Sequence, residues 1–163
     1  MRGIVVDLET TGLLKDDKIV SITLLEFNDN KIENIFNTFV DPMKPIKFDA
    51  TKVTGITNEM VKGFPQLYEH RKLILEIINN KFLYAYNSKF EERFLKQENI
   101  FVPGIYDILK PCKEHFKLGS YKLCDVASYL GIKAFQPHSS LGDAILCFKI
   151  LLALNERGHT WQF

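Results

Sequence analysis

Two acidic residues that directly follow an apolar run are the first candidates for chemistry in this sequence. Asp7 and Glu9 are separated by one residue and come after the apolar residues 4–6. Because side chains on a β-strand alternate between its two faces, both carboxylates are expected to point to the same face. Carboxylate oxygens are hard ligands that suit Mg²⁺ or Mn²⁺. The pattern therefore favours a metal site over the simpler explanation, a solvated strand end.

A third acid and a histidine lie close together near the end of the sequence. Asp143 is predicted to fall on the second turn of the last helix, and His138 lies just before that helix. Each residue alone has an ordinary explanation, since acids are favoured near helix N-termini and histidines are common in loops. The spacing becomes informative only if the fold brings this helix to the strand that carries Asp7 and Glu9.

The first half of the chain is predicted to form an antiparallel meander. Residues 2–9 have the β-branched composition of a buried strand, and residues 18–29 and 31–42 follow as two further β-rich segments. Asn28, Asp29 and Asn30 join the last two segments, and these residue types tolerate the positive φ of a hairpin turn.

The second half alternates predicted helices and strands. Thr57 can cap a short helical turn, and residues 66–80 carry apolar residues at helical spacing. Leu67, Ile74, Leu75 and Ile78 are expected to face the core. Strands are predicted at residues 81–87 and 105–109, and helices at 88–98, 121–131 and 139–158. The sequence therefore predicts an α/β fold, with a meander and strand-helix units in one mixed sheet flanked by helices.

Length and composition limit the class of protein. The chain has 163 residues, 46% hydrophobic, with a formal net charge of +1 and three cysteines without a CxxC pair. We expect one domain over residues 1–163, located in the cytoplasm and not in a membrane. The cysteines argue against a zinc knuckle or a disulfide framework. The small net charge argues against wrapping of a duplex, because neutralising many phosphates needs many Lys and Arg residues.

Three segments together carry a family resemblance. DLETTG at 7–12, YNSKFEERFL at 86–95 and HSSLGDA at 138–144 closely resemble, in this order, the three motifs of the DnaQ-like DEDDh exonucleases. VTGITNEMV at 53–61 and KLCDVASYLGI at 122–132 extend the resemblance over nearly the whole chain. It implies a ribonuclease H-like fold with a five-stranded mixed sheet, and a 3′→5′ exonuclease that releases nucleoside 5′-monophosphates.

The resemblance also implies roles for the candidate residues. Asp7, Glu9 and Asp143 would bind two divalent metal ions, Mg²⁺ or Mn²⁺, with Asp7 bridging them. Two such ions can stabilise both the attacking and the leaving oxygen. His138 would be the general base, because imidazole titrates near neutral pH and accepts a proton from water better than a carboxylate does.

The second motif departs from the family pattern. Phe90 is followed by Glu91, where the family presents an aspartate, and the extra C–C bond adds roughly 1.5 Å of reach. We expect Glu91 still to contribute to metal binding, with altered activity or a preference for Mn²⁺. In the same resemblance Asn87 helps hold the substrate strand, while Thr10 and Leu13 contact the terminal nucleotide. Turn and core roles are the alternative for these three residues.

The implied substrate is a single strand or a frayed 3′ end, with DNA favoured over RNA. A DNA polymerase is a possible partner, since relatives include proofreading subunits. The alternative function is a catalytically weak or silent nucleic-acid-binding or polymerase-accessory subunit, which the glutamate of the second motif favours. A lysine cluster is either a further contact to the substrate backbone or a solvated face: Lys110, Lys113, Lys117 and Lys122.

Overall fold

The protein is built around one mixed β-sheet. A computed structural model describes residues 1–134, 136 and 138–161. Its sheet has the strand order β3-β2-β1-β4-β5. The strands are β1 (Arg2–Thr10), β2 (Ile19–Asn28), β3 (Lys31–Phe39), β4 (Leu83–Ala85) and β5 (Tyr106–Asp107). β1, β2 and β3 pair antiparallel, whereas β4 pairs parallel with β1 and β5 parallel with β4. The predicted α/β class, the meander and the mixed five-stranded sheet are confirmed.

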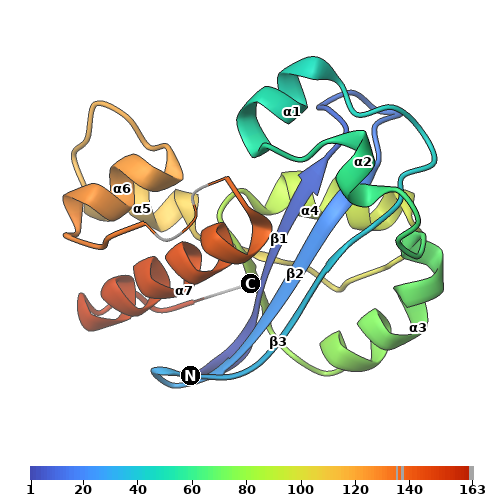
Figure 1. Ribbon diagram of the computed structural model, residues 1–163. Helices are drawn as coiled ribbons and strands as arrows, with labels where there is room; N and C mark the ends of the chain where they lie inside the picture. Colours follow the sequence, from blue (N-terminus) through green and yellow to red (C-terminus); the bar gives the residue numbers. More distant parts are fainter. Residues whose placement is uncertain (135, 137, 162–163) are drawn as a thin grey trace.

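Helices cover both faces of this sheet (Figure 1). The longer ones are α3 (Leu67–Ile78), α4 (Ser88–Gln97) and α7 (Ser140–Glu156); the shorter ones are α1 (Phe48–Thr54), α2 (Asn58–Val61), α5 (Leu109–His115) and α6 (Leu123–Tyr129). α5, α6 and α7 contribute to one core layer, and α3 and α4 to the other. Among the described residues, no helix combines the length and apolar character needed to cross a membrane.

The alternation of side chains along β1 assigns each residue to a layer. Val5 packs in the core layer that includes α7, whereas Ile4 and Val6 pack in the layer with α3 and α4. All three side chains are fully buried, and burial of an aliphatic side chain contributes about 1.5–3 kcal/mol. Because the period is two, Asp7 and Glu9 fall on the same face as Val5, the face that α7 covers.

Several details differ from the sequence predictions. β4 and β5 are shorter than the apolar segments that contain them, and α1 and α5 were not predicted. Leu67 and Ile74 are buried in the core as expected, but Leu75 is 40% exposed, so its predicted core position is wrong. The predicted cap of Thr57 is confirmed, since its side chain accepts a hydrogen bond from the N–H of Met60.

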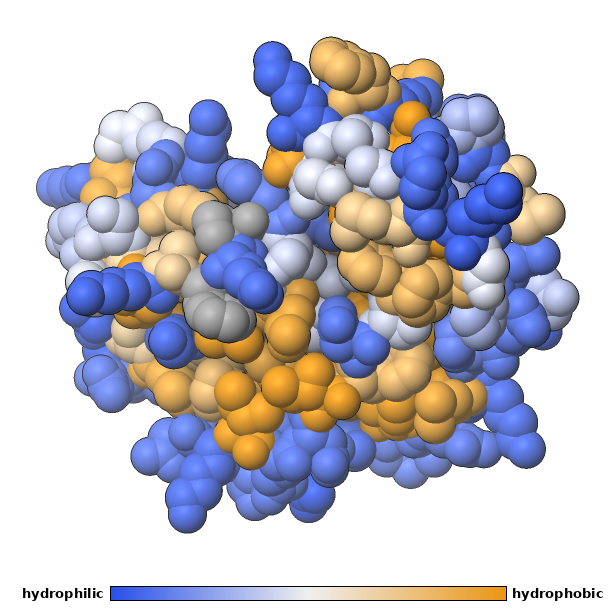
Figure 2. Space-filling model, viewed as in Figure 1, coloured by the Kyte–Doolittle hydropathy of each residue, from blue (hydrophilic) through white to orange (hydrophobic). Residues whose placement is uncertain are grey.

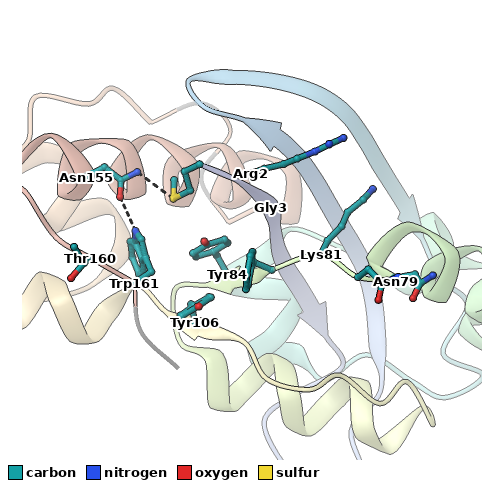
Figure 3. Close-up of a pocket in the computed structure, with 12 residues that line it drawn as sticks. Arg2, Gly3, Asn79, Lys81, Tyr84, Tyr106, Asn155, Thr160 and Trp161 are labelled. Carbon is teal, nitrogen blue, oxygen red and sulfur yellow. Dashed lines mark hydrogen bonds between the residues drawn. The ribbon is translucent and has the colours of Figure 1, made fainter.

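A pocket of about 650 Å³ opens at the amino end of β1. Figure 3 shows Tyr84, Tyr106 and Trp161 gathered on one side of it, with Arg2 and Lys81 on the other. This pocket lies far from the candidate carboxylates, because the six residues from Gly3 to Glu9 span roughly 20 Å along an extended strand. The pocket beside Glu9 is a different one.

Candidate active site

Three of the predicted acidic residues converge. Oxygen atoms of Asp7, Glu9 and Asp143 all lie within 4.8 Å of one another, a spacing at which one cation can contact all three side chains. Asp7 and Glu9 come from the carboxyl half of β1, and Asp143 from α7. α7 begins at Ser140, so Asp143 lies in its first turn rather than in the predicted second turn. The first turn of α7 lies beside β1 in Figure 1.

Glu91 lies close to this carboxylate group without belonging to it. It occupies the first turn of α4 and is only 5% exposed. Its charge contributes to the raised pKa of Asp7, after burial and the charge of Glu9. The Glu91 Oε2 atom is buried and has no hydrogen-bond partner among the described residues. A buried carboxylate oxygen without a partner is costly unless a cation or a proton satisfies it.

The carboxylates of this site raise one another's pKa values. Burial raises the pKa of Asp7 well above its ordinary value, and the charges of Glu9, Glu91 and Asp143 add to the rise. Burial and the charge of Asp143 raise the pKa of Glu9 to about 8. Burial also raises the pKa of Glu91 to about 8, with a contribution from Asp107. A divalent cation relieves this repulsion, so the donor set fits a metal such as Mg²⁺ or Mn²⁺.

The metal-free protein is expected to lose thermal stability as the pH rises from about 4.5 to about 8. The pKa values of Glu9 and Glu91, about 8 in the folded state, lie above the ordinary 4.5, so the unfolded chain releases these protons first. The stabilisation from the protonated carboxyl groups is complete below the unfolded-state pKa of 4.5. It is lost as the pH rises through the folded-state pKa of about 8. Calorimetry in EDTA across this range measures the slope of Tm against pH.

Glu91→Gln is the control for this slope, because it removes one of the titrating groups. Carboxylates with a lowered pKa, such as Asp17, act below this pH window and do not interfere. The Gln variant is expected to show a flatter decline of Tm. If the slope of Tm against pH were identical to that of the wild type, Glu91 would not contribute to the repulsion between the buried carboxylates.

His138 lies at the edge of the carboxylate group. Its backbone N–H donates a 3.3 Å hydrogen bond to Oδ1 of Asp143, and its exposed side chain partly offsets the raised pKa of Asp143. The backbone of His138 has φ of 62°, a left-handed conformation that is uncommon outside glycine and clusters at functional sites. The side chain of Ser139 caps α7 by accepting from the N–H of Gly142.

A second pocket, of about 550 Å³, adjoins the carboxylates. Its lining residues come from the end of β1, the following loop, α1 and α4: Glu9, Thr10, Gly12, Leu13, Leu14, Lys47, Asp49, Ala50, Val53, Thr54 and Phe90. Leu13 and Leu14 are 72% and 63% exposed, so adjacent apolar side chains line the pocket, which suits contact with a ligand. Thr10 and Leu13 therefore share this pocket. Asn87 does not line it; it is exposed and precedes the first residue of α4.

Comparison with protein-family models identifies the chain. The RNase T model, described as an exonuclease, matches residues 4–151. The chain belongs to the RNase T exonuclease family. A PolC-type DNA polymerase III from Clostridium perfringens is 34% identical over 91% of this chain, but the chain spans only 11% of that polymerase.

Solved structures of exonucleases share this fold. Exonuclease X in complex with 5′ overhanging duplex DNA superimposes with a TM-score of 0.80 at 25% identity, covering 96% of this chain and 93% of that one. The nuclease domain of a 3′ exonuclease, a DEDDh family member bound to rAMP, gives a TM-score of 0.82 at 18% identity and covers 98% and 95%. At 18% identity, the similarity to the 3′ exonuclease domain concerns the fold alone. The ribonuclease H-like fold expected from the motifs is confirmed.

Asp17 organises the loop beside the pocket next to Glu9 and was not predicted from the sequence. Its fully buried carboxylate accepts hydrogen bonds from Oγ1 of Thr11 at 2.8 Å and from the N–H of Leu14 at 2.7 Å. The Nζ of Lys47 lies 2.6 Å from it. A Cβ at Gly12 would come within 2.6 Å of Asp17, so this position requires glycine. The sequence context of Asp17 is that of a solvated charged loop, and only its burial reveals the role.

The lysine cluster predicted from the sequence lies on the surface of the protein. Its four side chains are exposed, on α5, on the loop that follows, and at the start of α6: Lys110, Lys113, Lys117 and Lys122. Figure 2 shows a hollow between the part of the surface over α5 and α6 and the part over α1 and α2. The cluster belongs to the segment from α5 to α6, and contact with a substrate backbone stays a prediction.

Proposed function

We propose that this exonuclease removes nucleotides one at a time from the 3′ end of a strand in a reaction that depends on two divalent metal ions. The convergence of three carboxylates within 4.8 Å of one another carries the proposal. The RNase T family match and the adjoining apolar pocket support it. One exonuclease domain over residues 1–163 is part of the proposal, supported by a single sheet shared by both core layers.

Asp7, Glu9 and Asp143 would hold the cations, with Glu91 contributing from the opposite helix. When bound, the ions would supply Lewis acidity that stabilises charge on the attacking and leaving oxygens. His138 would take a proton from the water that attacks the terminal phosphorus. The water oxygen would form a bond to phosphorus as the bond from phosphorus to the 3′ oxygen of the preceding nucleotide breaks. That oxygen would take up a proton, and a nucleoside 5′-monophosphate would leave.

The substrate would be positioned by the pocket beside Glu9. Thr10 and Leu13 would contact the terminal nucleotide, with the exposed leucine against its base, and Asn87 would hold the strand before it. Such positioning lowers the barrier because it orients the phosphodiester for attack before the reaction begins. A single strand or a frayed end fits best, since the base must leave its stack to enter the pocket.

DNA is the favoured substrate class, and a DNA polymerase is the favoured partner. The Clostridium perfringens relative is a DNA polymerase, and the exonuclease X structure holds DNA. RNA is the competing substrate class, because a solved 3′ exonuclease structure contains rAMP. The protein reads the sugar through contacts to the 2′-hydroxyl, which a direct comparison of the two substrates tests.

The deciding experiment is degradation of 5′-labelled single-stranded DNA and RNA with Mg²⁺, with Mn²⁺ or with EDTA. We expect a ladder that shortens from the 3′ end, faster on DNA, and no products in EDTA. Faster shortening of RNA would reverse the substrate preference. Intact strands from folded protein under every condition would refute the exonuclease activity and favour the alternative function, a silent nucleic-acid-binding subunit.

Glu91→Asp is expected to shift the metal preference by about tenfold toward Mg²⁺, within the usual effect of changing a group around a metal site. Mg²⁺ demands near-octahedral geometry, so the longer glutamate should fit it less well than it fits Mn²⁺. The measurement is the ratio of kcat/KM with Mn²⁺ to kcat/KM with Mg²⁺. Glu92→Asp is the matched control, because its side chain instead accepts a hydrogen bond from the N–H of Ile105. An unchanged ratio in the Glu91 variant would contradict a metal-binding role.

A further inference from the structure

A cluster of buried polar side chains lies between the sheet and the first turn of α7. The Oγ atoms of Ser21 and Ser140 are 2.7 Å apart, and Oγ1 of Thr23 donates to Oγ of Ser140 at 2.9 Å. Nδ2 of Asn37 donates to Oγ1 of Thr23 at 2.7 Å. Ser21, Thr23 and Ser140 are all buried. We call these four residues the hydroxyl cluster.

The hydroxyl cluster lies directly beside the candidate metal ligands. In the pairing of β1 with β2, Ser21 lies opposite Glu9 and Thr23 lies opposite Asp7. Paired residues of antiparallel strands point to the same face, so both hydroxyls lie on the face that carries the two carboxylates. Ser140 precedes Asp143 by three residues, which places both on neighbouring parts of one helical surface.

The cluster therefore joins β2, which pairs with the strand that carries Asp7 and Glu9, to the helix that carries Asp143 through short, directional bonds. One end is fixed to β2 next to Asp7 and Glu9, and the other end is the first residue of α7. Apolar contacts have no preferred direction, whereas hydrogen bonds between buried hydroxyls are lost when the helix shifts. A buried polar group that loses its hydrogen-bond partner costs free energy. This cost favours the one position of α7 in which every hydroxyl keeps its partner.

We infer that Ser140 and Thr23 are positioning residues that set the place of Asp143 relative to Asp7 and Glu9, and thereby the affinity of the site for a divalent cation. This inference rests on the proposed metal-dependent function. Neither hydroxyl is proposed as a ligand of the metal or as a contact to the substrate. They act through the placement of α7, and Asn37 on β3 completes the chain of donors that holds them.

The test is the affinity for Mn²⁺, measured by titration calorimetry without substrate, for Ser140→Ala and Thr23→Val. Both variants remove a hydroxyl while preserving size closely. We expect the dissociation constant for Mn²⁺ to rise about tenfold, at the lower end of effects seen for groups that orient metal ligands. Thr38→Val is the matched control, because Thr38 pairs with Ile22 and its hydroxyl donates to the carbonyl of the neighbouring Phe39.

A combined variant separates positioning from a general loss of stability. In the Asp143→Asn background the Ser140→Ala change is expected to have no further effect on Mn²⁺ binding, because its effect passes through Asp143. Lower Tm values with unchanged Mn²⁺ affinity in both single variants would overturn the inference. It would also be overturned if Ser140→Ala lowered the Mn²⁺ affinity as much in the Asp143→Asn background as in the wild type. A wild-type protein that binds no Mn²⁺ would instead refute the proposed metal site, and the inference with it.

Discussion

Replacing Asp7 with asparagine is expected to lower kcat by about 10⁴-fold or more. Asp7 is the most deeply placed of the converging carboxylates, and its charge interacts with Glu9, Glu91 and Asp143. Asparagine keeps the shape but removes the negative charge on which binding of the cations depends. Metal ions contribute several kcal/mol of transition-state stabilisation, and each 1.4 kcal/mol corresponds to about a factor of ten in rate. The measurement is single-turnover cleavage of 5′-labelled DNA in saturating Mn²⁺.

The same substitution is expected to raise the Tm of the metal-free protein. Burial and repulsion raise the pKa of Asp7, so the charged form is unfavourable in the folded state at neutral pH. Asparagine removes that cost, and a gain of 1 kcal/mol raises Tm by about 2–4 °C for a chain of this size. Active sites commonly sacrifice stability for function in this way.

The effect of Asp7→Asn on stability is expected to differ when Mn²⁺ is present. The wild-type protein is expected to gain stability when Mn²⁺ is added, because the ion binds only the folded state, and Asp7→Asn should gain little. Asp29→Asn is the matched control, since Asp29 is an exposed residue in the turn between β2 and β3 and has a left-handed backbone that asparagine also adopts. Wild-type activity in Asp7→Asn would show that the carboxylates do not form the metal site.

The sequence predicted those features that depend on local periodicity. The alternation along β1 placed Asp7 and Glu9 on one face, and the apolar run of α7 placed Asp143 on a helix that packs against the sheet. Their convergence followed from the motif resemblance, because no periodicity specifies where a helix at residue 140 meets a strand at residue 7. The structure supplies that contact, with oxygens of the three side chains within 4.8 Å of one another.

Features that depend on tertiary burial could not be predicted. Leu75 has helical spacing with Leu67 and Ile78, but this helix buries only a narrow stripe against the sheet, and Leu75 lies outside it. Asp17 and Ser140 belong to polar segments, and polar residues in such segments are usually solvated. Their roles arise because partners 30 and more residues away, Lys47 and Ser21, enclose them.

Replacing His138 with alanine is expected to lower kcat by about 10²- to 10⁴-fold, the usual contribution of a general base. The imidazole is exposed, and the backbone of the residue lies in the left-handed region and bonds to Asp143. His138 therefore lies at the edge of the carboxylate group, where its side chain would take a proton from a water molecule bound there. The measurement is kcat under single-turnover conditions, together with the dissociation constant for Mn²⁺.

The two readouts separate a proton acceptor from a structural residue. His138→Ala should bind Mn²⁺ with an affinity near that of the wild type, because the backbone N–H that bonds to Asp143 remains. Asp7→Asn should lose both Mn²⁺ binding and catalysis. The two variants therefore separate metal binding by Asp7 from proton transfer by His138. His70→Ala is the matched control, since His70 lies on α3 against Phe36, in the layer opposite α7. Loss of Mn²⁺ binding in His138→Ala would mean that the residue shapes the metal site, and its assignment as the base would be wrong.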